Sequence, residues 1–346
     1  MEPTGRTNPP LSPFFKGGLG SADEGQGKGE GVSLDFVSLA FVVGLLAAML
    51  RLATPLLFAT IGELLTERAG VLNLGIEGIM LMGAMSGYLI AYQAGNLWLG
   101  LLTAALTGAA LGLAMAFMAV TLGVSQHVSG LGITLLSTGL SQYIYRMVIG
   151  APSIPPSVHP FQVITLPGLG QLPVIGPILF QQYFLVWVAL ALVPLSSFLL
   201  SRTQLGLEIR TVGENPKAAE VAGVSVYGIR YLCLVVGGGL MALGGAFLSL
   251  AQFNFFLFGM VAGRGWISIA LVVFGNWRPG KCLAGALFFG GIDALQLRLQ
   301  AVGFKAIPYQ FFLILPYVLT IMALVSVSRR AAYPGSLLLP YMRGEA

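Results

Sequence analysis

The sequence predicts an all-α polytopic membrane protein with about ten transmembrane helices, and three observations support this fold class. Hydrophobic residues make up 56% of the 346 residues and charged residues only 9%, whereas soluble domains carry about 25% charge. The mean hydropathy is +0.85, and apolar runs long enough to cross a bilayer recur along the chain. The 47 glycines suit closely packed helices, because small residues let helices approach one another in lipid. The lipid bilayer is therefore the expected environment.

The N-terminal part of the chain is expected to contain a tail, one full span and one short helix. Residues 1–32 are rich in Gly, Pro and Ser without hydrophobic periodicity, which predicts a disordered cytoplasmic tail. A first span is expected at 34–50, with no small-residue cleavage site after it. The next apolar run, 54–66, is interrupted by Pro55 and Gly62 and is short for a crossing of about 20 residues.

A polar stretch at 66–78 separates this short run from the next span. Polar backbone at membrane depth is tolerated only where protein or a water-filled cavity surrounds it, so we expect this stretch near a translocation path or cytoplasmic gate. Asn73 and Glu77 are the candidate residues, since a carboxylate at this depth needs a donor or water. The alternative is that Glu77 caps or braces an adjacent helix end.

The remaining spans follow from apolar segments within a transmembrane domain at 33–328. They are expected at 74–92, 97–121, 127–149, 181–200, 229–251, 265–278, 281–299 and 309–327. With both termini cytoplasmic, including a C-terminal tail at 329–346, most basic residues lie inside, as the positive-inside rule requires. If 54–66 did not cross, the N-terminus would have to be outside to keep the polar loop at 205–230 inside. The net charge of +5 is explained by these loops and does not indicate nucleic-acid binding.

Isolated polar side chains in or beside these spans are further candidates for a translocation path. His127 enters a span beside Gln126, and helix-end capping is its alternative role. Gln252 and Asn254 accompany several phenylalanines, for which an interfacial aromatic belt is the alternative. Asp293 is one of few acids at depth, and a partner on another helix is its alternative role.

The longest polar interruption of the apolar sequence is 205–230, LGLEIRTVGENPKAAEVAGVSVYGIR. Asn215 and Pro216 predict a helix start, the alanine-rich run after them favours helix, and Gly223 predicts its end. Such a helix is either an ordinary connector or a docking helix, on which small side chains permit close approach and charges set the register. The candidate docking residues are Glu214, Asn215, Pro216, Ala218, Ala219, Ala222 and Gly223.

The run VGENPKAAEVAG resembles the cytoplasmic coupling loop of permease subunits of bacterial ABC importers, in the branch that handles simple sugars, nucleosides and branched-chain amino acids. Residues 54–84, 260–277, 293–300 and 330–341 resemble the nucleoside-importer permeases in particular, and the likeness covers 34–341. The resemblance implies alternating access in the bacterial cytoplasmic membrane. It also implies a second, homologous permease subunit, a cytoplasmic ABC ATPase, and an extracytoplasmic binding protein that delivers nucleosides or, as an alternative, a simple sugar. Rings and amides at 252–260 would suit a nucleobase.

Other functional classes find little support in the motifs. The run GQGKGE lacks the spacing of a Walker A motif, so ATP would be bound by a separate subunit. HExxH, GxSxG and clusters at metal-ligand spacing are absent from the sequence, so neither an enzyme nor a cofactor or metal site is expected. Cys233 and Cys282 likewise lack metal-ligand spacing. The alternative class is an ion-coupled secondary carrier, which would recruit Glu77 and Asp293 but has no need of a docking loop.

Overall fold

The structure is a computed structural model that describes residues 39–301 and 333–341, together with positions 314, 318, 321, 322 and 325. The tail expected at 1–32 and most of the span expected at 309–327 lie outside the described residues. Residues 39–346 form one compact unit, and the account below concerns the described part of that unit.

Ten α-helices lie within the described residues. They are α1 (Leu39–Arg68), α2 (Ile76–Ala94), α3 (Leu97–Ala116), α4 (Gln126–Ile149), α5 (Phe184–Arg202), α6 (Gln204–Glu214), α7 (Pro216–Val221), α8 (Val226–Phe247), α9 (Arg264–Phe274) and α10 (Pro279–Ala301). π-Helical turns at Phe117–Thr121 and Leu248–Gln252 extend α3 and α8. The loop before α5 contains the strands β1 (Ile164–Thr165) and β2 (Gln181–Gln182), paired antiparallel with Ile164 opposite Gln182, and short helical turns at Leu169–Gln171 and Gly176–Phe180.

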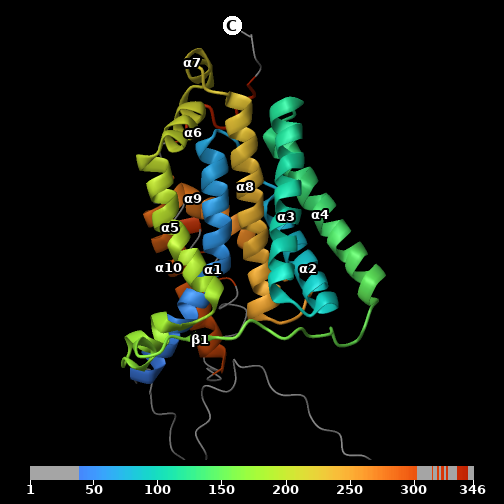
Figure 1. Cartoon of the computed structure of the whole chain (residues 1–346), viewed down its shortest axis with the longest axis vertical. Coiled ribbons are helices and arrows are strands. Elements are labelled where there is room, and N and C mark those ends of the chain that lie inside the picture. Colours follow the sequence, from blue (N-terminus) through green and yellow to red (C-terminus); the bar gives the residue numbers. More distant parts are fainter. Residues whose placement is uncertain are drawn as a thin grey trace, which may run out of the picture. The chain divides into compact units, whose positions relative to one another are not determined.

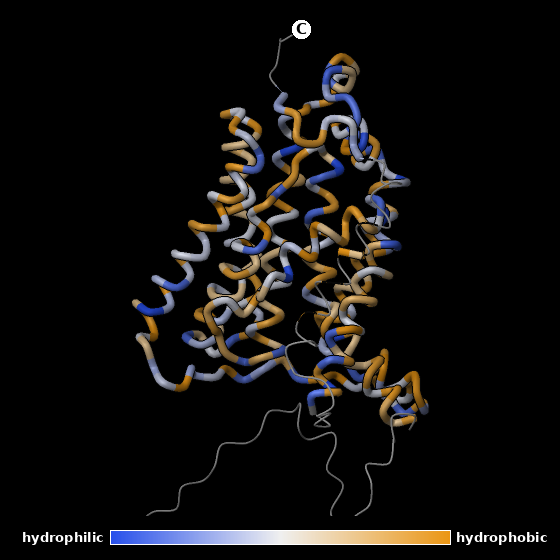
Figure 2. Tube along the Cα trace, turned by 180° about the vertical axis from the view of Figure 1, so that it is seen from behind, coloured by the Kyte–Doolittle hydropathy of each residue, from blue (hydrophilic) through white to orange (hydrophobic). Residues whose placement is uncertain are grey.

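Five of these helices are long and apolar enough to cross a membrane, namely α1, α3, α5, α8 and α10, with α3 and α8 counted together with their π-helical turns. α9 is a shorter apolar helix. Figure 2 shows mainly hydrophobic long helices, with hydrophilic stretches at the end of the bundle that carries α6 and α7. The protein is thus a mostly helical membrane protein, while the number of about ten crossings stays a prediction.

The expected separation of 34–50 from 54–66 is wrong, because residues 39–50 and 54–66 belong to the single helix α1 of 30 residues. Pro55 lies inside this helix, where neighbouring groups in a membrane protein compensate for its missing N–H. The carbonyl that loses its usual N–H partner is that of Arg51, one turn earlier, and the helix nonetheless continues to Arg68. As a result, α1 begins at the end of the bundle that carries β1 and finishes at the end that carries α6 and α7 (Figure 1).

The core is organised around α8, which packs against α1, α2 and α3. Glycines make these contacts close: a Cβ added to Gly62 of α1 would lie 2.6 Å from the Gly237 carbonyl oxygen of α8. On the other side, Gly108 and Gly112 of α3 lie directly against the α8 backbone. Close backbone approach through small residues is the packing expected of helices in lipid. It holds α8 in place, and the α6–α7 segment leads directly into the start of this helix.

Candidate coupling site

The α6–α7 segment protrudes from one end of the bundle (Figure 1), and local sequence explains its two helices. The Thr203 hydroxyl caps α6 by accepting from the Gly206 N–H at 3.1 Å. Asn215 caps α7, since its side-chain oxygen accepts from the Ala218 N–H at 3.1 Å and Pro216 occupies the first turn. Gly223 follows with φ of +87°, a left-handed conformation that favours glycine. The predicted start and end of this helix are confirmed.

The surface of α7 divides the candidate docking residues into two groups. Ala218, Ala222 and Gly223 are exposed, so their small side chains are open to a partner. Ala219 is only 3% exposed and belongs to an apolar cluster beneath the helix, so it anchors α7 instead of presenting a docking contact. Val221, which the sequence reasoning missed, is 90% exposed. Its signal in the sequence was an apolar β-branched residue inside a polar loop.

The described C-terminal residues 333–341, called the C-terminal segment below, contact the end of α6 at Glu214. The Ser336 N–H donates to the Gly213 carbonyl at 2.8 Å, and its hydroxyl donates to the carbonyls of Gly213 and Val212 at 2.8 and 3.1 Å. The Gly335 N–H donates to the Glu214 carboxylate at 3.1 Å. Further along, the Tyr341 hydroxyl donates to the carboxylate of Glu220 on α7. The described C-terminal residues therefore hold α6 and α7 from outside.

On the side facing the bundle, α6 rests on the end of α1 and the turn that follows it. A Cβ added to Gly213 would overlap the Arg68 carbonyl, with its carbon 2.9 Å away. The Arg230 side chain, 1% exposed, donates to the Ala69 carbonyl at 3.2 Å and to the Ser336 hydroxyl at 3.4 Å. α6 is thus in direct contact with the end of α1 and the first residues of the turn that follows it.

Residues 69–75 run back along the last turns of α1, and polar side chains form hydrogen bonds with the buried backbone N–H and C=O groups of this segment. The Gln126 side chain accepts from the Leu72 N–H at 2.8 Å and donates to the Gly70 carbonyl at 3.3 Å. The Thr134 hydroxyl donates to the Leu74 carbonyl at 2.9 Å. This pattern agrees with the rule that irregular backbone at membrane depth is surrounded by protein.

Asn73 belongs to the same arrangement. It is fully buried, its N–H donates to the Glu63 carboxylate at 2.9 Å, and its side-chain oxygen accepts from the Gly75 N–H at 2.9 Å. These bonds hold the turn before α2. The structure therefore assigns Asn73 contacts within the subunit.

Glu63 and Glu67 form a buried pair that the sequence reasoning missed. They lie one turn apart on α1 and are both fully buried, and two carboxylates at this spacing repel each other when ionised. Donors outside α1 offset part of this cost: the Asn73 N–H donates to Glu63 at 2.9 Å, and the Trp277 indole N–H donates to Glu67 at 2.6 Å. The signal was two acids, four residues apart, at the end of an apolar run.

Glu77 takes the helix-end role that the sequence left open. Its two carboxylate oxygens accept from the N–H groups of Gly263 and Gly265, each at 2.8 Å, at the N-terminus of α9. A carboxylate there also interacts favourably with the helix dipole. α9 therefore begins on Glu77, deep in the bundle, and ends near Trp277 beside the α6–α7 end.

The remaining path candidates do not gather at one place. Asp293 of α10 lies within the electrostatic range of Arg264 of α9. His127 is exposed on α4, while its neighbour Gln126 is buried. Gln252 and Asn254 each contain a buried side-chain oxygen for which the described residues provide no hydrogen-bond donor.

This geometry is that of a polytopic membrane protein whose projecting loop contacts buried polar turns. The chain belongs to the family described as branched-chain amino acid transport system / permease component, whose model matches residues 45–324. The resemblance noted for the sequence is confirmed at this level.

Several curated proteins are similar to the chain. The putative glucose ABC transporter permease protein TsgC13 of Haloferax volcanii is 40% identical over 274 residues, which cover 78% of this chain and 82% of that protein. The guanosine ABC transporter permease protein NupQ of Bacillus subtilis is 35% identical over 320 residues, 90% of this chain and all of that protein. The nucleoside ABC transporter permease protein NupC of Lactococcus lactis is 33% identical over 300 residues, 84% and 94% of the two chains. No solved structure matches the chain.

Proposed function

We propose that this chain is a transmembrane subunit of an ATP-driven nucleoside importer, and that α7 docks a cytoplasmic ABC ATPase. The observation that carries the proposal is the protruding, capped helix α7, whose exposed Val221 is bordered by small residues and by the charges of Lys217 and Glu220. An exposed apolar residue surrounded by polar positions is typical of a contact anchor. A secondary carrier has no need of such a surface.

The contacts beneath α7 support a route for the coupling. ATP-driven closure of the ATPase would push α7 and α6, and Gly213 would carry this motion to the turn after α1. Through residues 69–75 the motion would reach Glu77 and the N-terminus of α9. Rigid-body tilting of packed helices is an established way to alternate access, and this chain of contacts leads from the surface to the middle of the bundle.

The charge distribution supports a cytoplasmic position for α6 and α7. Basic residues gather at their end of the bundle, as expected for the cytoplasmic side of a membrane protein. They are Arg68, Arg202, Arg210, Lys217, Arg230, Arg278 and Lys281. In this orientation α1 would begin on the extracytoplasmic side, which is the alternative stated above for the case that 54–66 is not a separate crossing. A second permease subunit and an extracytoplasmic binding protein complete the proposed importer.

Nucleosides are the proposed substrate class because relatives named for guanosine and nucleosides align over most or all of their length. The amide oxygens of Gln252 and Asn254, for which the described residues provide no donor, offer acceptors that a nucleobase could use. Simple sugars are the alternative, favoured by the similarity to the putative glucose permease.

Uptake into vesicles tests the proposal. Vesicles carrying this chain with its candidate permease partner, ATPase and binding protein are given labelled guanosine, adenosine, uridine, ribose or galactose, with and without ATP. ATP-dependent nucleoside uptake is expected. Uptake of sugars alone would overturn the substrate, and transport without ATP or the ATPase would favour an ion-coupled carrier.

A further inference from the structure

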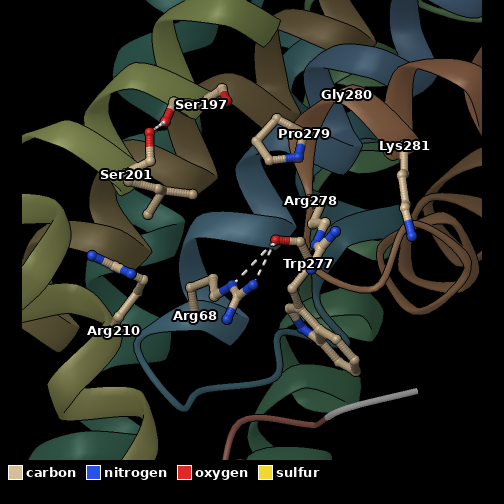
Figure 3. Close-up of a pocket in the computed structure, with 10 residues that line it drawn as sticks. Arg68, Ser197, Ser201, Arg210, Trp277, Arg278, Pro279, Gly280 and Lys281 are labelled. Atoms are coloured by element: carbon tan, nitrogen blue, oxygen red, sulfur yellow. Dashed lines mark hydrogen bonds between the residues drawn. The ribbon is translucent and has the colours of Figure 1, made fainter. Parts of the chain in front are cut away.

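A basic pocket of about 430 Å³ lies beside α6 at the same end of the bundle as α7. Four elements contribute polar side chains to it: the end of α1, the last turns of α5, α6, and the turn into α10. The polar residues that line it are Arg68, Ser197, Ser201, Arg210, Arg278 and Lys281 (Figure 3). Residues distant in sequence thus bring four cationic groups to one cavity.

Positive charge in this pocket exceeds the negative charge near it. None of the described residues that line the cavity is acidic. Arg210 and Arg278 are both close enough to Arg68 to repel it, and the acid that attracts Arg68, Glu214, also accepts the Gly335 N–H. Gathering like charges is unfavourable unless an anion offsets them. The pocket therefore has the electrostatics of an anion site.

The available donors suit a phosphate group. Guanidinium groups present several N–H donors in a planar fork that matches phosphate oxygens, and the ammonium of Lys281 adds a point charge. On the opposite wall Ser197 contributes a hydroxyl group, while the Ser201 hydroxyl donates to the Ser197 carbonyl at 2.6 Å (Figure 3). α10 begins at Pro279, on the edge of the same cavity, and its dipole adds to the positive potential.

The surface beside the pocket is apolar. Leu195 and Phe198 of α5 are each 60% exposed, and Phe288 of the adjoining α10 is also exposed. They lie one to two turns from Ser201 and Lys281 along their helices, toward the middle of the bundle. This arrangement places a charged recess next to a hydrocarbon-like surface, which is how membrane proteins bind anionic headgroups at the cytoplasmic face.

We propose that this basic pocket binds a phosphate group, supplied by an anionic phospholipid of the surrounding membrane or by a soluble phosphate compound. The apolar surface of α5 and α10 favours the phospholipid, because acyl chains would cover it. Bound phosphate would join Arg68 at the end of α1 to Arg210 of α6. It would thus stabilise the contact on which α6 rests.

The test uses the full-length chain in nanodiscs of phosphatidylcholine, alone, with phosphatidylglycerol, or with inorganic phosphate added. Thermal unfolding is followed in each arm, and retained phosphatidylglycerol is counted by mass spectrometry after exchange into detergent. The double variant Arg278→Gln, Lys281→Gln removes two charges from the pocket. The double variant Arg202→Gln, Lys217→Gln removes two charges from the same end of the bundle, outside the pocket, and is the matched control.

We expect phosphatidylglycerol to raise the unfolding temperature of the wild type and of the control. In the pocket variant its binding should weaken by about 30-fold, from the usual contribution of two basic residues at a membrane surface. The charge-conserving variant Arg278→Lys, Lys281→Arg should retain binding, which separates loss of charge from misfolding. An effect of inorganic phosphate without one of phosphatidylglycerol would identify the soluble source. No effect of either, or equal effects in the pocket variant and its control, would overturn the proposal.

Discussion

Replacing Gly213 by alanine should push α6 away from the end of α1. The added Cβ would lie 2.9 Å from the carbonyl carbon of Arg68, where carbon atoms normally stay about 3.5–4.0 Å apart. Because the obstacle is backbone, no rotation of a side chain relieves it, and α6 must move outward by about 1 Å. Its bonds to Ser336 would lengthen with this movement.

The magnitude follows from two opposing contributions. Overpacking of this kind costs about 1–3 kcal/mol, while alanine gains about 1 kcal/mol over glycine in helix propensity. A net destabilisation of about 1 kcal/mol lowers the unfolding temperature by a few degrees. Transport should suffer more, with a roughly tenfold loss for each 1.4 kcal/mol by which the coupled arrangement is disfavoured.

The assay compares ATP-driven uptake and thermal unfolding of Gly213→Ala with those of Gly139→Ala. Gly139 is the matched control, because it lies within α4 and a Cβ added there meets no atom of the described chain within 4 Å. The control should keep normal uptake and stability. If Gly213→Ala behaves like the control in both measurements, the α6 contact does not transmit coupling.

Three further substitutions test neighbouring parts of the account. Val221→Asp should reduce ATP-dependent uptake by tenfold or more without lowering the unfolding temperature, because the residue contacts little within the subunit; normal uptake would exclude it from docking. Ser336→Ala should lower the stability by about 1–2 kcal/mol, since Arg230 loses an acceptor, and an unchanged melting curve would show that the C-terminal segment does not hold α6. Glu77→Gln should also cost about 1–2 kcal/mol in thermal unfolding, because one oxygen at the α9 N-terminus is replaced by a donor; full stability would refute the capping role.

The parts of the fold that sequence reasoning predicted are those governed by local chemistry. Asn215, Pro216 and Gly223 define α7 through capping and backbone preferences, which act over a few residues. Apolar runs located the long helices for the same reason. The wrong prediction of a break near Pro55 has a physical cause. In lipid, a proline does not end a helix when neighbouring groups satisfy the freed backbone. Pro55 therefore interrupts the apolar pattern of the sequence without interrupting α1.

The buried polar contacts could not be predicted, because they join segments far apart in the sequence. Glu67 meets Trp277 and Gln126 meets Leu72 only after the helices have packed. The sequence showed that Glu77, an acid at membrane depth, requires hydrogen-bond donors. It did not show that the donors would be backbone N–H groups at the N-terminus of α9. His127 was named as a path candidate for its place beside Gln126 at the start of a span, whereas the Gln126 amide can donate and accept at once and so serves a buried turn.

The most direct test of α7 as the docking helix is labelling of a thiol placed at its tip. The two native cysteines, Cys233 and Cys282, are both buried, so Val221→Cys introduces an exposed thiol. The variant is treated with a maleimide and with a short bifunctional cross-linker, in membranes with and without the co-expressed ATPase. The account predicts protection from the maleimide and a cross-link to the ATPase subunit. Equal labelling in both membranes, with no cross-link, would contradict it.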